Sequence, residues 1–201
     1  MGLKKFVIGA FGTNTYLVTK GDKAVLIDPG MDFSGILDEV NKYEIEAILI
    51  THGHVDHIDG CGYIDAPIYV GKEDLVNFSD LGRSLYKMCG MKPTYGNKKL
   101  NLIGVTDNEI INTPSFIFKC FHTPGHTEGS YCYLYYDNLF TGDTLFNMSI
   151  GRMDFPTGNM KKMQESLKKI VSIFPDETKV YPGHDNKTTI KEEKKYNPYL
   201  K

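Results

Sequence analysis

Cysteine and tryptophan are scarce in this chain: its 201 residues include four cysteines and no tryptophan. The cysteines, at positions 61, 89, 120 and 132, form no Cys-x-x-Cys pair and no dense framework. This pattern argues against a closed thiolate zinc site and against a disulfide-stapled fold. We expect the four cysteines to be core thiols in a reducing compartment.

Long apolar runs and an excess of charge are also missing. No stretch approaches the length of a membrane span, and residues 12–14 interrupt the N-terminal segment before a signal-peptide core could form. The net charge of −2 gives no general attraction to nucleic acid. We therefore expect a soluble cytoplasmic protein with no nucleic-acid or membrane partner, and the sequence leaves its oligomeric state open.

What the sequence does contain is a dense group of potential metal ligands. Three histidines and two aspartates fall between positions 52 and 59, directly after the short apolar run Ala47–Thr51. Such a run is typical of a buried parallel strand, and strand ends in layered α/β folds carry ligand sites. Imidazole with carboxylate and no thiolate favours a hydrolytic or oxygen-handling metal over a structural zinc.

Three further candidate ligands follow strand-like segments: His126, Asp143 and His184. A full assignment gives His52, His54 and His126 to one ion, Asp56, His57 and His184 to the other, and Asp143 to both as a bridge. Two ions about 3.5 to 4 Å apart can act together in a hydrolysis. His122 is left over, and we expect a packed or supporting residue rather than a ligand.

The remaining pattern has two halves, each with strands followed by a helix. The expected strands cover residues 3–8, 15–19, 24–27, 47–51, 68–70, 101–105, 109–112, 116–121, 131–136, 139–141 and the segment from 179, and the expected helices cover 33–43, 73–78 and 160–174. With a hydrophobic content of 41% and no linker, this predicts one α/β domain over residues 1–201. Its layers would be αββα, with the site along one edge.

Two features have two interpretations each. Asp28, in Asp-Pro-Gly at the end of a strand, is either a turn former or a carboxylate that supports a metal-bound histidine. The segment Ser79–Lys99 has no periodic pattern and is interrupted by glycine and proline. It is either a lid over a substrate or a surface loop.

The motifs together resemble the metallo-β-lactamase superfamily over nearly the whole chain. The resemblance rests on His-x-His-x-Asp-His at 52–57, Thr-Pro-Gly-His-Thr at 123–127, Thr-Gly-Asp-Thr at 141–144 and Gly-His at 183–184. Residues 149–156 and 189–200 are similar to the short hydroxyacylglutathione hydrolase (glyoxalase II) subgroup. The resemblance implies an αββα sandwich of the metallo-β-lactamase type and two divalent ions, most often Zn²⁺ and in some members iron or manganese. It also implies hydrolysis of a thioester such as S-lactoylglutathione.

The mechanism expected from these ligands is attack on the acyl carbon by a hydroxide shared between the ions. Asp56 would orient that hydroxide, and a thiolate leaves without a dedicated general acid. The alternative function is that of a persulfide dioxygenase of the same superfamily, which binds a single iron. That enzyme has a segment similar to Gly-Arg-x-Asp-Phe at 151–155 of this chain. A lactonase is a further alternative. A metal-bearing redox or binding module is disfavoured by the seven ligands.

The sequence departs from full-length glyoxalase II in its length. That family carries an additional helical domain that binds glutathione, and we expect none here. The thiol half of a substrate would then be held by the rim of the site. Candidate rim residues are Arg83, Tyr86 and Lys87, together with Arg152, for which an ion pair with Asp154 is the alternative to substrate contact.

Overall fold

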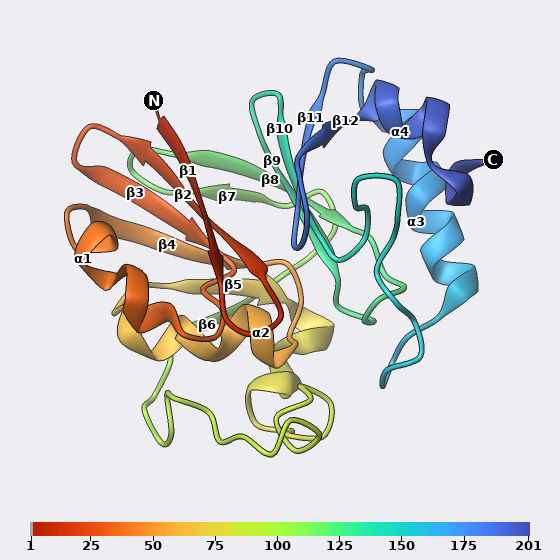
Figure 1. Ribbon diagram of the computed structural model, residues 1–201. Helices are drawn as coiled ribbons and strands as arrows, with labels where there is room; N and C mark the ends of the chain where they lie inside the picture. Colours follow the sequence, from red (N-terminus) through yellow and green to blue (C-terminus); the bar gives the residue numbers. More distant parts are fainter. Residues whose placement is uncertain (1) are drawn as a thin grey trace.

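Two β-sheets form the centre of the molecule, and helices cover their outer faces (Figure 1). The computed structural model describes residues 2–201. Each sheet buries one face against the other sheet and one against helices, so the chain is the αββα sandwich predicted from the sequence. No helix within residues 2–201 is long and apolar enough to cross a lipid bilayer.

The first sheet contains β1 (Gly2–Ile8), β2 (Thr13–Lys20), β3 (Lys23–Ile27), β4 (Glu44–Ile50), β5 (Ile68–Gly71) and β6 (Leu102–Val105), in that order. The strands β1 to β3 are antiparallel, which confirms the predicted opening meander, and β3 to β6 are parallel. Gly21 has a φ of 63° in the tight turn between β2 and β3, a conformation that favours glycine.

The second sheet contains β7 (Ile110–Asn112), β8 (Ile117–His122), β9 (Tyr131–Tyr135), β10 (Asn138–Gly142), β11 (Lys179–Pro182) and β12 (Thr188–Thr189). It is antiparallel except between β10 and β11. Parallel neighbours end at the same edge of a sheet, so the segments after β10 and β11 lie together. A Cβ atom on Gly142 would lie 2.2 Å from Oγ1 of Thr51, which shows how closely the end of β10 approaches the end of β4.

The helices are α1 (Leu37–Val40), α2 (Val55–Ile58), α3 (Met160–Ile173) and α4 (Ile190–Tyr196), with 3-10 helices at Phe33–Ile36, Asp59–Tyr63, Lys72–Phe78 and Pro198–Leu200. The helix α3 confirms the predicted amphipathic helix. The continuous helix predicted for residues 33–43 is wrong, because Ile36, with φ −116° and ψ 2°, separates a 3-10 turn from α1. Its apolar face still packs on the first sheet through the buried Phe33 and Val40. The helix α4 was not predicted, although Thr189 and Glu192 at its start have the spacing of a capping box.

Side chains along the strands alternate between two cores. In β4, Ala47 and Leu49 face the second sheet, whereas Ile48 and Ile50 face the helices around α2. This period of two is expected of a strand buried on both faces. All four cysteines are free, and three of them are buried as expected, whereas Cys89 is only partly buried.

Candidate metal centre

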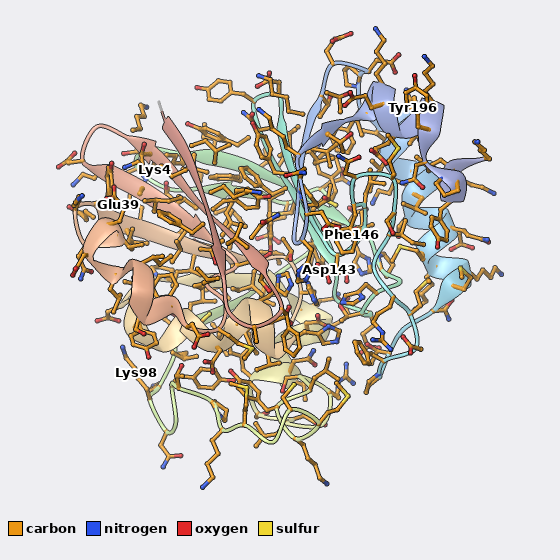
Figure 2. All side chains as sticks on the ribbon, viewed as in Figure 1. Lys4, Glu39, Lys98, Asp143, Phe146 and Tyr196 are labelled. Carbon is orange, nitrogen blue, oxygen red and sulfur yellow. The ribbon has the colours of Figure 1, made fainter. Side chains whose placement is uncertain are left out.

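Seven side chains converge at the edge where β3, β4, β10 and β11 end. One of them, Asp143, is labelled near the centre of Figure 2. They form three overlapping groups: a first with His52, His54 and His126; a second with Asp56, His57 and His184; and a third with His52, His57 and Asp143. Within each group the candidate ligand atoms lie within 4.8 Å of one another. The seven are the residues that the sequence pattern singles out as ligands.

The first group consists of three histidines. His52 and His54 follow β4 with one residue between them, and His126 comes from the loop after β8. Nε2 of His126 is 2.9 Å from Nδ1 of His54 and 3.1 Å from Nε2 of His52. The other ring nitrogen of His126, Nδ1, donates to the backbone carbonyl of Arg152 at 2.6 Å, so Nε2 is directed toward the other two rings. Three imidazoles this close together can bind one ion.

The second group combines two residues of α2 with one residue after β11. Oδ2 of Asp56 lies 3.4 Å from Nε2 of His57 and 3.4 Å from Nε2 of His184. Asp143 lies between this group and the first. Its Oδ1 is 3.4 Å from Nε2 of His57, and its Oδ2 is 3.5 Å from Nε2 of both His126 and His184. A carboxylate in this place can reach ions on both sides.

Several atoms of the centre are buried without a hydrogen-bond partner. Two of them, Nε2 of His57 and Oδ1 of Asp143, lie 3.4 Å apart in the centre, and the third, Nε2 of His54, is the ring nitrogen that does not face His126. Such atoms are rare in proteins because desolvation without a partner is costly. Their gathering at one place, with only nitrogen and carboxylate oxygen as donors, fits bound Zn²⁺, iron or manganese.

The charges of the centre also favour cations. Burial lowers the pKa of His54 to about 3 and that of His52 well below its usual value, so both rings are neutral, the form that binds metals. Burial disfavours the charge on Asp143, but the neighbouring His57 lowers its pKa to about 2. Burial likewise disfavours a charge on His57, yet Asp56 and Asp143 raise its pKa well above its usual value. The two carboxylates therefore attract positive charge.

Asp28 contacts both the cluster and the strand that carries it. Its Oδ2 accepts a hydrogen bond from Nδ1 of His57 at 3.0 Å, which leaves Nε2 of that ring directed into the centre. The backbone nitrogen and Oγ1 of Thr51 donate to the same carboxylate at 2.8 and 2.7 Å. The contacts are those of a supporting carboxylate, and a φ of 50° makes Asp28 part of the turn as well.

Asp74 joins two of the ligand-bearing loops and was not predicted as a residue of the site. Its Oδ2 accepts hydrogen bonds from the nitrogen of Gly53, between two ligand histidines, and from Oγ1 of Thr127, both at 2.8 Å. Its Oδ1 accepts from the nitrogen of Gly129 at 3.1 Å. Burial raises the pKa of this carboxyl, and the hydrogen bonds from the three donors offset part of the cost of burying its charge.

Two polar residues at the start of β2 support the second group and were also missed. Oγ1 of Thr13 donates to Oδ2 of Asp56 at 2.9 Å. The side-chain nitrogen of Asn14 donates to the carbonyls of Pro182 and Asp185, at 2.9 and 3.0 Å, on either side of His184 in the sequence. Both are buried, and a local pattern of threonine and asparagine in a strand carries no signal for such distant contacts.

A cavity of about 440 Å³ opens over the centre. Its polar lining includes Asp56, Asp143 and three of the histidines, and apolar side chains form most of the rest. The apolar lining includes Phe11, Leu85, Met88, Phe146, Ile150 and Phe155. Phe146 and Asp143, both labelled in Figure 2, follow β10 in the sequence and line the cavity. The ring of Phe146 meets that of His184 edge to face, with centroids 5.7 Å apart.

The helix α4 holds one wall of this cavity. The carboxylate of Glu193, fully buried, accepts hydrogen bonds from the nitrogen of Met148 at 3.1 Å and from Oγ1 of Thr188 at 2.8 Å. The side chain of Asn197 donates to that carboxylate at 2.7 Å and to the carbonyl of Ser149 at 3.1 Å. These hydrogen bonds to Met148 and Ser149 therefore hold in place the loop that carries Phe146 and Ile150.

The segment 79–101 has no regular helix or strand, yet three of its expected rim residues do not line the cavity. Tyr86 is fully buried and donates to Oδ1 of Asp59 at 2.7 Å. Arg83 is paired with Glu128, and Lys87 points to solvent. The rim residues were predicted because their side chains are cationic or aromatic. The backbone of the segment instead turns Leu85, Met88 and Cys89 toward the cavity. Whether it moves as a lid stays a prediction.

Arg152 does line the cavity, and it is paired with Asp154. Nε and Nη2 of Arg152 donate to the two carboxylate oxygens of Asp154 at 2.6 and 2.5 Å. The guanidinium also lies over the ring of Phe155, 4.1 Å from its centroid. The geometry therefore matches the ion pair considered from the sequence.

His122 lies outside all three ligand groups. Its Nε2 donates to the carbonyl of Glu128 at 2.9 Å, and its ring stacks on Tyr131 at a centroid distance of 4.9 Å. These contacts make it a packed residue. No contact with a ligand side chain is present among the described residues, and His122 reaches the loop that carries His126 only through the Glu128 carbonyl.

We predict that His122→Gln keeps the metal content of the wild-type chain and loses less than about tenfold in activity, below the typical effect of a residue that orients a ligand. A glutamine can still donate to the Glu128 carbonyl. His126→Gln is the matched control, and it should lose at least one metal ion per chain in elemental analysis. A lost metal equivalent in His122→Gln would contradict the assignment.

The model of the metallo-beta-lactamase superfamily matches residues 8–184, a span that contains all seven candidate ligands. This chain belongs to the metallo-β-lactamase superfamily. Among its relatives in the superfamily, a protein of Aquifex aeolicus is 32% identical over 99% of this chain and 97% of that protein. The hydroxyacylglutathione hydrolase GloC of Haemophilus influenzae is 28% identical over 100% of this chain and 98% of its own length.

Several solved structures have the same fold. The crystal structure of the BLEG-1 B3 metallo-beta-lactamase matches with a TM-score of 0.91 and 31% identity over 99% of both chains. A protein crystallised in a di-iron-bound form matches with a TM-score of 0.85 and 30% identity, covering 98% of this chain and 100% of the other. ETHE1 from Myxococcus xanthus matches with a TM-score of 0.79 and 30% identity, covering 98% of this chain and 84% of the other.

Proposed function

We propose that this superfamily member is a binuclear hydrolase that cleaves thioesters of the hydroxyacylglutathione type, with two divalent ions, most often Zn²⁺ and otherwise iron or manganese. The observation that carries the proposal is the position of Asp143 between two groups of ligands, beside His126 of the first and His57 and His184 of the second. Similarity over the full length to a hydroxyacylglutathione hydrolase supports a small-molecule thioester as substrate.

The roles of the side chains follow from their positions. Two divalent ions held by the seven ligands would lower the pKa of a water molecule and polarise the carbonyl of the substrate. Asp56 can accept a hydrogen bond from the attacking water, because it lines the cavity and Thr13 fixes its carboxylate. The apolar walls keep other water molecules away from the reacting carbon. A thiolate leaves without a proton from a general acid.

The second candidate function is a persulfide dioxygenase with a single iron. The segment 151–155, on which this alternative depends, contributes Arg152 and Phe155 to the lining of the cavity. A hydrolase with two ions and a dioxygenase with one iron differ in metal content, in the need for O₂ and in product. A lactonase would share the metal content of the hydrolase and differ only in substrate.

The test is a panel of substrates with metal-loaded protein: S-lactoylglutathione, a lactone and glutathione persulfide with O₂ monitored by electrode. We expect release of free thiol from the thioester, no O₂ uptake, and loss of activity on treatment with a chelator. Zn²⁺ added back should restore the thiol release. Consumption of O₂ with persulfide by protein that holds one iron would overturn the proposal in favour of the dioxygenase.

A further inference from the structure

The charge around the mouth of the cavity bears on which thiol the site accepts. Among the described residues that line the cavity, Arg152 is the one lysine or arginine. A glutathione thioester carries two carboxylates and one ammonium at neutral pH. Recognition of carboxylates in proteins commonly uses a free guanidinium fork or a lysine.

The guanidinium of Arg152 is not free. Two of its nitrogens donate to the two oxygens of Asp154, and Phe155 covers one face of the guanidinium. The hydrogen bond with Arg152 lowers the pKa of Asp154 to about 2, so the aspartate is ionised at neutral pH. The pair is therefore electrically neutral, and the carboxylate of a substrate would have to compete with Asp154 for the fork.

The rest of the lining favours uncharged groups. Phe11, Leu85, Met88, Phe146 and Ile150 present apolar surface around the mouth and the walls. Apolar surface gains from contact with apolar groups and leaves a charged group without partners, which is costly. The cationic side chains nearest in sequence to this surface are turned elsewhere: Arg83 pairs with Glu128, and Lys87 does not line the cavity.

We propose that the cavity prefers thioesters whose thiol half is uncharged, and that Asp154 sets this preference by occupying Arg152. The inference rests on the proposed thioester hydrolysis and specifies the class of its leaving group. S-lactoylglutathione is then a substrate that reacts without tight binding. A thiol with a neutral amide, such as N-acetylcysteamine, meets no unfavourable charge on the way to the centre.

The experiment compares two thioesters of the same acyl group, S-lactoylglutathione and S-lactoyl-N-acetylcysteamine, with zinc-loaded protein. The wild-type chain should show a kcat/KM at least about threefold higher for the neutral thioester. Asp154→Asn removes the negative charge and one of the two acceptors of Arg152, so it should lower that ratio about two- to fivefold, the range of one exposed charge pair. The change should appear mainly as a lower KM for the glutathione thioester, with kcat preserved.

Asp137→Asn is the matched control. Asp137 pairs with Lys179 and does not line the cavity, and the two substitutions change the net charge equally. The control should leave the ratio as it is in the wild-type chain. A wild-type preference for glutathione, or a ratio that Asp154→Asn does not change, overturns the inference while thioester hydrolysis stands. Hydrolysis of neither thioester would overturn the proposed function and the inference with it.

Discussion

Asp143→Ala should abolish hydrolysis and weaken the binding of both metal ions, while the chain remains folded. The carboxylate faces His57 through one oxygen, and His126 and His184 through the other, so its removal takes a ligand atom from each side. Because bound ions contribute several kcal/mol to the stabilisation of a hydrolytic transition state, we expect kcat/KM to fall by about 10³-fold or more. Elemental analysis and thiol release measure the two effects on one sample.

The control for this variant is Asp176→Ala, which removes an exposed carboxylate that pairs with Lys194 away from the cavity. It should keep the metal content and the activity of the wild-type chain, because exposed ion pairs contribute little. Circular dichroism should show that Asp143→Ala keeps its secondary structure. An Asp143→Ala protein that still binds two ions per chain would refute the bridging assignment.

Asp74→Ala should cost about 3 kcal/mol of unfolding free energy and weaken zinc binding about 10- to 100-fold. The substitution leaves the nitrogens of Gly53 and Gly129 and the hydroxyl of Thr127 without their acceptor in a buried place. Gly53 and Thr127 adjoin ligand histidines, so the loops that carry those histidines lose their common anchor. Urea unfolding of the metal-free protein measures the first effect, and zinc titration measures the second.

Glu193→Ala separates the loss of stability from the loss of the anchor. Glu193 is also a fully buried carboxylate that accepts several hydrogen bonds, but its donors belong to the cavity wall, to β12 and to the residue that follows α4. It should lower the unfolding free energy by a similar amount and leave zinc affinity within about twofold of the wild-type value. Equal loss of zinc affinity in both variants would show that Asp74 acts only through global stability.

The sequence predicted the fold and singled out the seven residues of the centre because each follows a strand in a short local motif. His52, His54, Asp56 and His57 are neighbours in sequence, and the αββα order requires the ends of β4, β10 and β11 to meet at one edge. The predicted meander and the helix α3 could be recognised for the same reason. The periodicity of apolar residues and the presence of turn-forming residues are local properties of a sequence.

The supporting residues could not be predicted, because their partners are distant in the sequence. Asp74 contacts Thr127, and Thr13 contacts Asp56, and no local pattern marks either pair. The rim was predicted from residue type alone, and of its residues Arg152 lines the cavity whereas Arg83, Tyr86 and Lys87 do not. The direction of each side chain between residues 79 and 99 depends on an irregular backbone, which buries Tyr86 and turns Leu85 and Met88 toward the cavity.

We expect the seven ligands to hold two ions that work together on a thioester. A titration of the chelator-treated chain with Zn²⁺ can be followed by calorimetry and, in the same samples, by the rate of thiol release from a thioester. We predict that binding saturates at two ions per chain and that activity reaches its plateau at the second equivalent. Saturation of both signals at one ion per chain would show that the seven residues do not form a binuclear centre.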